Sequence, residues 1–452
     1  MVYIFRPHNG KLKVGLFGLG KSNLGVLELL RSRLPEFELT VRADTPQSAD
    51  VAADRCFFGS RALESIDEDV LFLSPSVRRD KPELLDAQKR GTRLSSDAEL
   101  FFSLKCSDVY AVTGSDGKST TTYLISEMLT RSGIRAIPAG NFGRSLCTAA
   151  GTGSTVVAEL SSFQLQYLTP SCLSAVITNI TPNHLNWHTS LAEYTDAKMN
   201  IVKNAERVTV DYDSELLRAA LPKIKLFCAV SLDLSYRELR RRCDAENYMT
   251  CSDSVVYLNG SPYFGIRDAM RRESYNVRNY MLSAASTLGA STPSAITETV
   301  GSFGGLTHRA ERIATHQGIT YINSSIDSTP DRTLKTLGAL RGNTAVILCG
   351  IGKGLPLDEL AMQLPRLTVG AVLMGDIGRE LSALLNGTEY KFARAENMSD
   401  AIAIAESYLP YGGNLVLSPA GTSFDNYKNF EMRGEDFKAL VLAHITNKKD
   451  KE

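Results

Sequence analysis

A glycine-rich turn between an apolar run and a helical pattern constrains the possible folds of this chain more than any other sequence feature. The segment VTGSDGKST, residues 112–120, follows the apolar run 108–112 and opens a helical pattern over 119–131. Glycines let backbone N–H groups turn toward phosphate oxygens, and a helix N-terminus adds partial positive charge. Lys118 is placed to reach β- and γ-phosphates, and the Ser119 hydroxyl to bind Mg²⁺.

The phosphate-loop motif is imperfect, because the strict pattern requires glycine at position 112, where this chain has valine. The alternative is a glycine-rich turn with an exposed lysine. A strand before the loop and a helix after it favour a nucleotide phosphate site over that alternative. They also require an α/β architecture around it.

Short β-rich runs alternate with longer helical patterns along the whole chain, which predicts βαβ units and parallel sheets. The cycle restarts near residues 108 and 319, and 452 residues correspond to roughly three domains. We predict an α/β fold with three domains: an N-terminal Rossmann-like domain (1–102), a central P-loop mononucleotide-binding parallel sheet (103–305) and a C-terminal Rossmann-like domain (306–452). The predicted strands are 13–18, 38–42, 70–73, 108–112, 155–160, 175–179, 207–210, 319–323, 344–349, 371–374 and 414–418.

Composition excludes several classes of protein. Fifty basic and fifty acidic residues give a formal net charge of zero, which argues against general electrostatic capture of nucleic acid or of an anionic membrane. No apolar run is long enough for a transmembrane helix, and the N-terminus lacks signal-peptide features. The eight cysteines are dispersed without a CxxC pair, so we expect reduced thiols. We expect a cytoplasmic protein and, without an evident assembly segment, a monomer.

A second glycine-rich turn, residues 18–25, also follows a strand and opens a helix. It contains Gly18 and Gly20, but residue 23 is asparagine where the dinucleotide fingerprint requires its third glycine. Asp44, at the end of the next strand, is placed to meet a ribose or a base. A nicotinamide dinucleotide, another phosphate-bearing nucleotide and a purely structural turn all remain open here.

Polar residues at two further strand ends suggest a metal site. Glu159 ends one β-run and His184 follows another, and the carboxyl ends of parallel strands carry ligand chemistry in α/β sheets. A lone histidine is more often structural, but two such residues beside a phosphate loop favour Mg²⁺. Trp187 and His188 are interpreted as packing residues. Lys198, taken alone, is interpreted as a solvated lysine on a helix.

Taken in order, these motifs resemble those of the Mur ligase family of peptidoglycan synthesis, and most closely its glutamate-adding branch. The resemblance covers nearly the whole chain. The runs ELSSFQL and SPA…KNFEMRG point to that branch in particular. The matching segments are 18–20, 114–120, 140–143, 159–165, 179–185, 306–309 and 417–434.

The resemblance implies an ADP-forming amide ligase. ATP would phosphorylate the carboxylate of UDP-N-acetylmuramoyl-L-alanine, and the amine of D-glutamate would attack the acyl phosphate. Bringing three substrates together is an orientation problem, which suits a three-domain enzyme that closes. Developing charge would be neutralised by Mg²⁺ and lysines.

The resemblance also implies individual roles. The catalytic residues would be Lys118, His184 and Lys198, the last converted by CO₂ to a carbamate that binds metal as a carboxylate does. The magnesium ligands would be Ser119, Glu159, His184 and Lys198. ATP would meet Gly114, Ser115, Asp116, Gly117, Lys118, Ser119, Thr120, Asn276 and Arg309. The UDP-substrate would meet Ser22, Asp44, Thr45, Asn141, Ser161 and Gln164. D-Glutamate would meet Lys353, Ser423 and Phe430.

One segment departs from the family pattern. Where the family typically has Asn-Asp-Ser-Lys-Ala-Thr-Asn, this chain has NSSIDST over residues 323–329. Ser324 therefore replaces an aspartate and Ile326 a lysine, and Asp327 is a candidate substitute for the lost acid. Three hypotheses follow: an active D-glutamate-adding ligase, a catalytically impaired nucleotide-binding relative, or a sister ligase with another amino acid or acceptor, such as a folylpolyglutamate-synthase-like enzyme.

Overall fold

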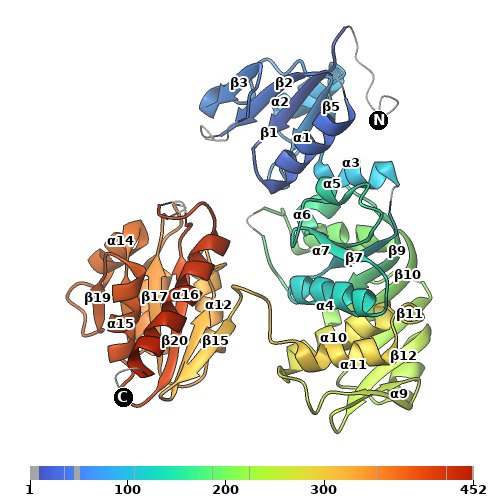
Figure 1. The fold of residues 1–452 in the computed structure, drawn as a ribbon. Helices are drawn as coiled ribbons and strands as arrows, with labels where there is room; N and C mark the ends of the chain where they lie inside the picture. The colour runs from blue at the N-terminus through green and yellow to red at the C-terminus, as the bar shows by residue number, and fades with distance from the viewer. Residues whose placement is uncertain are drawn as a thin grey trace. The chain divides into compact units, whose positions relative to one another are not determined.

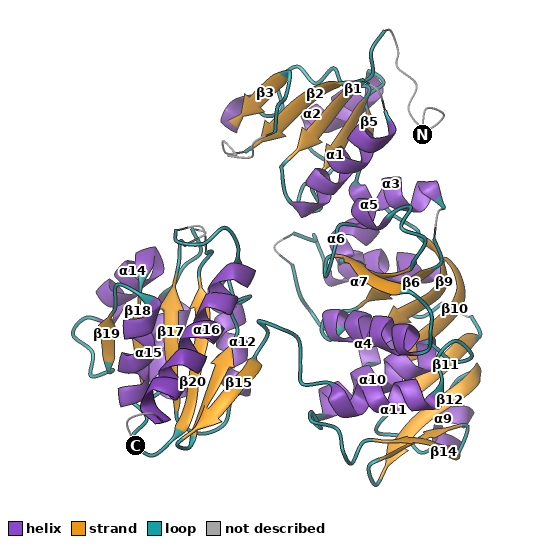
Figure 2. Ribbon diagram, viewed as in Figure 1, coloured by secondary structure: helices purple, strands orange, loops and turns teal. Residues whose placement is uncertain are grey.

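The computed structural model describes residues 10–34, 36–44, 51–105, 107–185, 187–222, 224–352, 354–423 and 425–449. Thr45 and Lys353, two predicted binding residues, lie outside this part of the chain. Backbone contacts divide the chain into two units, Met1–Phe303 and Gly304–Glu452. The described residues form three mainly parallel sheets with helices between their strands (Figures 1 and 2). The predicted α/β class is confirmed, whereas the three domain boundaries remain a prediction.

The first sheet has the strand order β3-β2-β1-β4-β5, and every pair is parallel. Its central strands read as continuous apolar runs because both faces are covered by other elements. The elements are β1 (Lys13–Phe17), α1 (Lys21–Arg33), β2 (Glu38–Ala43), β3 (Arg55–Phe58), the 3₁₀ turn η1 (Gly59–Arg61), β4 (Val70–Leu73), α2 (Pro82–Lys89), β5 (Arg93–Ser95) and α3 (Asp97–Leu104).

A buried ion pair fixes β2 against the segment that leads into β4. Arg42 and Glu68 lie 2.9 Å apart and both side chains are fully buried. The same guanidinium donates to the carbonyl oxygens of Ala62, Glu64 and Ser65. Because every partner comes from one segment, the pair holds the carboxyl edge of β2 in a single position.

The second sheet has the order β14-β13-β12-β11-β10-β9-β6-β8-β7, parallel from β7 to β12. Helix α4 packs against α10 and α11. The strands are β6 (Val109–Thr113), β7 (Ala136–Gly140), β8 (Thr155–Glu159), β9 (Ser171–Ile177), β10 (Asn204–Asp211), β11 (Leu226–Ser231), β12 (Ala245–Ser252), β13 (Val255–Leu258) and β14 (Ser261–Gly265). The helices are α4 (Lys118–Arg131), α5 (Leu146–Ala149), α6 (Ser162–Leu165), α7 (Leu191–Met199), η2 (Asn200–Val202), α8 (Glu215–Ala220), α9 (Tyr236–Arg242), α10 (Ser274–Ser286) and α11 (Pro293–Ser302).

An antiparallel meander extends this sheet beyond the strands predicted from the sequence. Strands β12, β13 and β14 pair antiparallel. The turns between them have positive φ at Asp253 and Ser254, and at Asn259 and Gly260. Two adjacent residues in this conformation form the tight turns that suit twisted hairpins, and Asn-Gly is their strongest sequence signal.

The unit Gly304–Glu452 contains the third sheet, with the order β15-β16-β20-β17-β18-β19 and one antiparallel pair, β15 with β16. Helices α15 and α16 pack on one face, and α12, α13 and α14 on the other (Figure 2). The elements are β15 (Glu311–His316), β16 (Ile319–Asn323), α12 (Pro330–Ala339), β17 (Thr344–Cys349), α13 (Asp358–Leu367), β18 (Gly370–Leu373), α14 (Gly375–Leu385), β19 (Phe392–Arg394), α15 (Met398–Ser407), β20 (Gly413–Ala420) and α16 (Phe430–Lys449).

The sequence predicts no membrane-spanning helix and reduced cysteine thiols. In the part of the chain that the structure describes, no helix combines the length and the apolar run needed to cross a bilayer. Seven cysteines in that part carry free thiols, and burial raises the pKa of the Cys172 thiol to about 12, which keeps it protonated and unreactive.

Replacing Glu68 with alanine tests the buried pair. The variant leaves a buried guanidinium without its anion, so we expect the free energy of unfolding to fall by about 3–5 kcal/mol. Urea unfolding at neutral pH, followed by circular dichroism, measures it. The matched control is Glu36→Ala, whose partner Lys11 is exposed, and this variant should leave the unfolding midpoint unchanged. Equal midpoints for the two variants would contradict this account.

Candidate nucleotide and metal site

The carboxyl ends of three neighbouring strands meet at one edge of the central sheet. In the parallel register Val112 of β6 lies beside Glu159 of β8 and Val176 of β9. Strand β9 ends at Ile177 rather than at the predicted residue 179. Thr178 therefore leaves the sheet and donates a hydrogen bond of 2.5 Å to the carbonyl oxygen of Asp116 in the phosphate loop. The three strand ends thus build a single site.

The phosphate loop needs its glycines for two separate reasons. Gly114 has φ +149°, and a Cβ there would lie 1.8 Å from Thr178 Oγ1. Gly117 has φ +79°, and a Cβ there would lie 2.5 Å from Asn279 Oδ1 of α10. Both positions therefore combine a backbone conformation that favours glycine with no space for a side chain. Helix α4 begins at the next residue, Lys118, so the loop leads directly into a helix N-terminus.

Two lysine side chains converge on one carbonyl oxygen of this loop. Lys118 Nζ donates to Gly114 O at 2.9 Å and to Ser115 O at 2.8 Å. Lys198 Nζ, from α7, donates to the same Gly114 O at 2.7 Å. Lys198 is 2% exposed and its ammonium lies 4.7 Å from the ring centroid of Tyr194. The interpretation of Lys198 as a solvated surface lysine is therefore wrong, because helix α7 turns this side chain inward.

Burial is the main cause of an unusual pKa at Lys198. It lowers the pKa of this ammonium well below its ordinary value, and the nearby charge of Lys118 lowers it further. The carboxylates of Glu159 and Asp116 act in the opposite direction but do not offset the burial. The neutral form of this amine is therefore more accessible than that of an exposed lysine, and a neutral amine is a nucleophile.

Glu159 has a free carboxylate oxygen directed into the protein. Its Oε1 accepts a hydrogen bond of 2.9 Å from Asn141 Nδ2. Its Oε2 is buried and has no hydrogen-bond partner. Buried carboxylate oxygens without partners are unfavourable unless a cation or another donor satisfies them. With Ser119, buried in the first turn of α4, Glu159 offers the hard oxygen ligands that Mg²⁺ prefers.

His184 lies on the loop between β9 and α7. It is an exposed residue with φ +56°, in the left-handed region, and its ring lies 5.1 Å from that of Phe163. Within the described residues, no cluster of three or more His, Cys, Asp or Glu side chains is already arranged as a metal site. Such a cluster would not include the predicted magnesium ligands as a set, because two of them are the hydroxyl of Ser119 and a modified Lys198.

The residues predicted to meet the UDP-substrate fall into two groups. Ser22 is the second residue of α1 and Asp44 follows β2, at the carboxyl edge of the first sheet. Asn141 follows β7, while Ser161 caps α6 and exchanges hydrogen bonds with Gln164 in a capping box. Lys21 Nζ, next to Ser22, donates to the carbonyl oxygen of Asn141 at 3.3 Å, which links the two groups.

Asp97 lies near residues of both groups, Ser22 and Gln164. It was not among the site residues predicted from the sequence. It is 1% exposed, and neither carboxylate oxygen has a hydrogen bond of normal geometry. Burial raises its pKa, and the Ser22 hydroxyl and the Gln164 side chain lower it in part. An aspartate in the first turn of a helix is ordinary capping chemistry, so its spacing in the sequence carries no signal for this position.

The remaining predicted ATP contacts lie in separate units. Asn276, in the first turn of α10, is buried and donates to Glu273 Oε2 at 3.1 Å. Arg309 is exposed in the second unit, next to the buried His308. The D-glutamate candidates Ser423 and Phe430 lie in the same unit, where Ser423 is buried and Phe430 begins α16.

Asp327, the candidate substitute for the acid that the 323–329 segment lacks, is buried within its own unit. Its carboxylate is turned into the second unit, where Thr336 and Ser418 donate to Oδ2 at 2.7 and 2.8 Å. Burial raises its pKa, and the Ser324 hydroxyl is among the groups that lower it in part. Asp327 therefore ties its own loop to β20 and α12.

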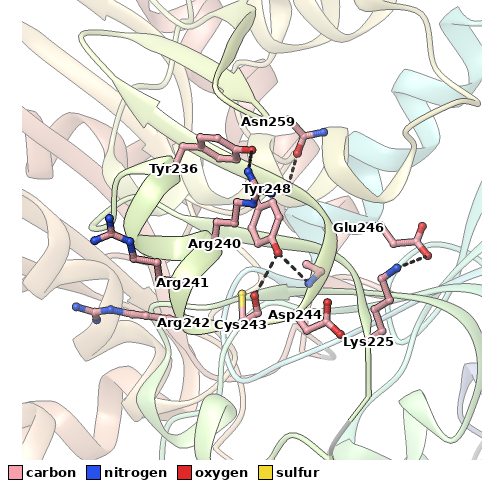
Figure 3. A pocket seen from close by; sticks show the side chains of 11 residues that line it. Lys225, Tyr236, Arg240, Arg241, Arg242, Cys243, Asp244, Glu246, Tyr248 and Asn259 are labelled. Atoms are coloured by element: carbon pink, nitrogen blue, oxygen red, sulfur yellow. Dashed lines mark hydrogen bonds and ion pairs between the residues drawn. The ribbon is translucent and has the colours of Figure 1, made fainter.

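A cavity of about 850 Å³ lies away from this chemistry (Figure 3). Lys225 precedes β11 and Asp244 precedes β12, so the cavity opens at the amino edge of the sheet, opposite the phosphate loop. The side chains of Arg241 and Arg242 extend away from Tyr248 in Figure 3. Ligands bind at the other edge of such sheets, so we do not assign substrate to this cavity.

Comparison with known proteins finds one family throughout. Residues 112–287 match the Mur ligase middle domain. UDP-N-acetylmuramoylalanine–D-glutamate ligase of Acetivibrio thermocellus is 33% identical over 82% of this chain and 82% of its own. The protein of that name from Ruminiclostridium cellulolyticum is 30% identical over 95% and 96%. Among solved structures, UDP-N-acetylmuramate-alanine ligase of Thermotoga maritima matches with a TM-score of 0.58 and 18% identity, covering 96% of this chain and 100% of that one.

The variant Gly114→Ala tests the phosphate loop. The new methyl group collides with Thr178 Oγ1, so we expect the affinity for Mg-ATP, measured by calorimetry, to fall at least about tenfold, which is about 1.4 kcal/mol. The control is Gly301→Ala, at a position in α11 where a Cβ meets nothing within 4 Å; its affinity should not change. An unchanged affinity in Gly114→Ala would exclude this loop as the nucleotide site.

Proposed function

This chain belongs to the Mur ligase family, and we propose that it joins D-glutamate to UDP-N-acetylmuramoyl-L-alanine while ATP becomes ADP and phosphate. The reaction is taken from relatives that align over nearly the whole chain. The observation that carries it is the convergence of Lys118 and the buried Lys198 on Gly114, beside the unpartnered oxygen of Glu159.

The reaction has two steps, because a carboxylate is a poor electrophile. A carboxylate oxygen of the alanyl group attacks the γ-phosphorus of ATP, the bond to the β-phosphate oxygen breaks, and ADP leaves. The free amine of D-glutamate then attacks the acyl carbon. The tetrahedral intermediate collapses to an amide as phosphate leaves with the bonding electrons, and the nitrogen loses a proton. Charge develops on phosphoryl oxygens in the first step and on the acyl oxygen in the second.

The chain's own residues would hold and orient the phosphates. Lys118 donates to two loop carbonyl oxygens, and its ammonium would exchange these acceptors for the β- and γ-phosphates that would fill the loop. The backbone of residues 114–120 would cradle the same phosphates, and Asn276 and Arg309 would meet the rest of the nucleotide. Fixed donors of this kind stabilise charge without reorganising during the reaction.

Ser119, Glu159, His184 and Lys198 would hold Mg²⁺. The buried, unpartnered Oε2 of Glu159 fits a cation, and the oxygen donors suit a hard metal ion. When bound, Mg²⁺ neutralises phosphate charge. Lys198 would contribute as a carbamate: its neutral amine attacks CO₂, an N–C bond forms, and one proton is released. The buried cation is thereby replaced by an anion that carries two oxygen ligands.

The three sheets would divide the substrates between them. We propose that residues 1–102 bind the UDP-substrate through Ser22, Asp44 and Thr45, assisted by Asn141, Ser161 and Gln164. Residues 103–305 would bind ATP. Residues 306–452 would bind D-glutamate through Lys353, Ser423 and Phe430, with the ammonium of Lys353 facing a glutamate carboxylate. A monomer in the cytoplasm, where ATP and nucleotide-sugars occur, suits this chemistry and requires neither nucleic acid nor membrane.

The altered segment 323–329 favours one competing function, a relative that binds nucleotide without catalysis. Ser324 and Ile326 lack the charges found in the family, and Asp327 is engaged inside its own unit. Against this alternative, the chain keeps Lys118, Glu159, His184 and Lys198, the residues that would hold phosphate and Mg²⁺.

Release of ADP by the purified protein tests the proposal. With Mg-ATP and UDP-N-acetylmuramoyl-L-alanine in bicarbonate buffer, we expect turnover that requires D-glutamate and is at least about tenfold slower with L-glutamate, since one inverted centre misplaces the amine or a carboxylate. The control reaction omits the UDP-substrate. Nucleotide binding without turnover for either isomer would favour the binding-only relative.

A further inference from the structure

Two loops that are far apart in sequence hold each other within the first unit. Trp187 Nε1 donates to the carbonyl oxygen of Ser76 at 2.8 Å. Arg78 Nη1 donates to the carbonyl oxygen of Trp187 at 2.8 Å, and the guanidinium carbon of Arg78 lies 4.9 Å from the indole ring centroid. We name Ser76, Arg78, Trp187 and Glu193 the Arg78–Trp187 clasp. It joins the loop after β4 to the loop that carries His184.

The clasp is charged and continues into helix α7. The carboxylate of Glu193, in the first turn of α7, accepts hydrogen bonds from Arg78 Nη2 at 3.1 Å and from Arg78 Nη1 at 3.3 Å. The guanidinium of Arg78 is the main cause that lowers the pKa of Glu193 to about 2. A two-point contact of an arginine fork fixes orientation as well as distance. Helix α7 also presents Lys198, so the clasp fixes the element that brings Lys198 to the phosphate loop.

The indole ring of Trp187 also reaches the His184 side of the loop. It packs on Phe163 with centroids 4.4 Å apart, and Phe163 lies 5.1 Å from the His184 ring. The backbone N–H of Trp187 donates to the carbonyl oxygen of His184 at 3.0 Å. His184 has a positive φ, which is unfavourable for a residue with a side chain and persists only where neighbours impose it.

A second path leads from the same loop to the phosphate loop. His188 is buried, and its Nε2 lies 3.0 Å from Ser162 Oγ. Its ring lies 5.3 Å from that of Tyr194. The Tyr194 hydroxyl lies 2.7 Å from Ser115 Oγ in the phosphate loop. Direct contacts therefore run from the first sheet to the loop that would hold ATP.

The other end of the clasp lies at the candidate UDP-substrate site. Ser74, two residues before Ser76, borders the Gly18 turn, where a Cβ on Gly18 would lie 2.6 Å from Ser74 Oγ. Ser74 N also donates to Phe17 O at 3.1 Å. Strand β1 pairs with both β2 and β4, so the turn after β4 lies on the same sheet edge as Ser22 and Asp44. A ligand bound at that edge would therefore lie next to this turn.

We infer that Trp187 is a positioning residue for His184, and that the Arg78–Trp187 clasp couples the UDP-substrate site to the phosphate loop and the magnesium ligands. The identity of the substrate rests on the proposed function, whereas the coupling rests on the contacts above. Packing alone would need the indole ring but not its N–H. Here the N–H and the guanidinium each reach a main-chain oxygen of the opposite loop, which sets the register of the loops.

Tryptophan fluorescence tests this inference, because Trp187 is the single tryptophan of the chain. Mg-ADP is the probe, since it fills the phosphate loop whatever the second substrate is. In the unmodified protein we expect Mg-ADP to shift Trp187 emission, and UDP-N-acetylmuramoyl-L-alanine to tighten Mg-ADP binding by about fivefold, the lower range of linked sites. In Arg78→Lys, which keeps the charge but loses the fork, the emission shift and the tightening should both disappear.

Kinetics with Trp187→Phe complete the test. This variant keeps an aromatic ring and loses the N–H donor. We expect the Mg²⁺ concentration for half-maximal ADP release to rise about tenfold, roughly the loss of one hydrogen bond to a positioned loop, with the KM for D-glutamate unchanged. The matched control is Arg61→Ala. Arg61 also pairs with a glutamate and lies over an aromatic ring, but both partners are close to it in the N-terminal part of the chain. This variant should behave as the unmodified protein.

The two proposals fail in different ways. No ADP release by the unmodified protein, with an emission shift on Mg-ADP that Arg78→Lys abolishes, would refute the ligase activity and support the clasp. Normal D-glutamate-dependent turnover and Mg²⁺ dependence in both Arg78→Lys and Trp187→Phe, together with an unchanged emission shift on Mg-ADP in Arg78→Lys, would refute the clasp and leave the ligase activity intact.

Discussion

The carbonyl oxygen of Gly114, which accepts hydrogen bonds from Lys118 and Lys198, is the interaction on which the site depends. Two ammonium groups on one oxygen repel each other, and burial already disfavours the charge on Lys198. The conflict is resolved if Lys198 gives up its proton. A lysine that would otherwise oppose a cation then becomes a group that CO₂ can convert into an anion beside Glu159.

The parallel core of the fold could be predicted from sequence because buried parallel strands are continuous apolar runs. The runs at Lys13–Phe17, Val70–Leu73 and Thr344–Cys349 are strands within a residue of expectation. The meander after β12 was missed, although the Asn259-Gly260 pair is a hairpin signal. Strand Glu311–His316 was also missed, since its residues are only partly buried and an edge strand carries no continuous apolar run.

Some residues of the candidate site could likewise be predicted from the sequence, and others could not. Residues at strand ends, such as Glu159, and the glycines of the phosphate loop were predictable from local order along the chain. Asp97 and the burial of Lys198 were not, since each depends on helices that meet only in three dimensions. Arg433, buried in α16, could not be predicted either. It donates to the carbonyl oxygens of Ser325 and Gly421. These bonds hold the altered segment 323–329 against the end of β20, although the segment lacks the charged side chains found in the family.

Carbon-13 NMR of the protein in labelled bicarbonate shows whether Lys198 reacts with CO₂, because it observes the product of the neutral Lys198 amine. We expect one carbamate carbon per chain at neutral and mildly alkaline pH, absent from Lys198→Arg. Acidification should remove the signal before the protein unfolds, since protonation of the amine releases CO₂. A protein that turns over ATP with D-glutamate but shows no carbamate carbon at any pH would contradict the account.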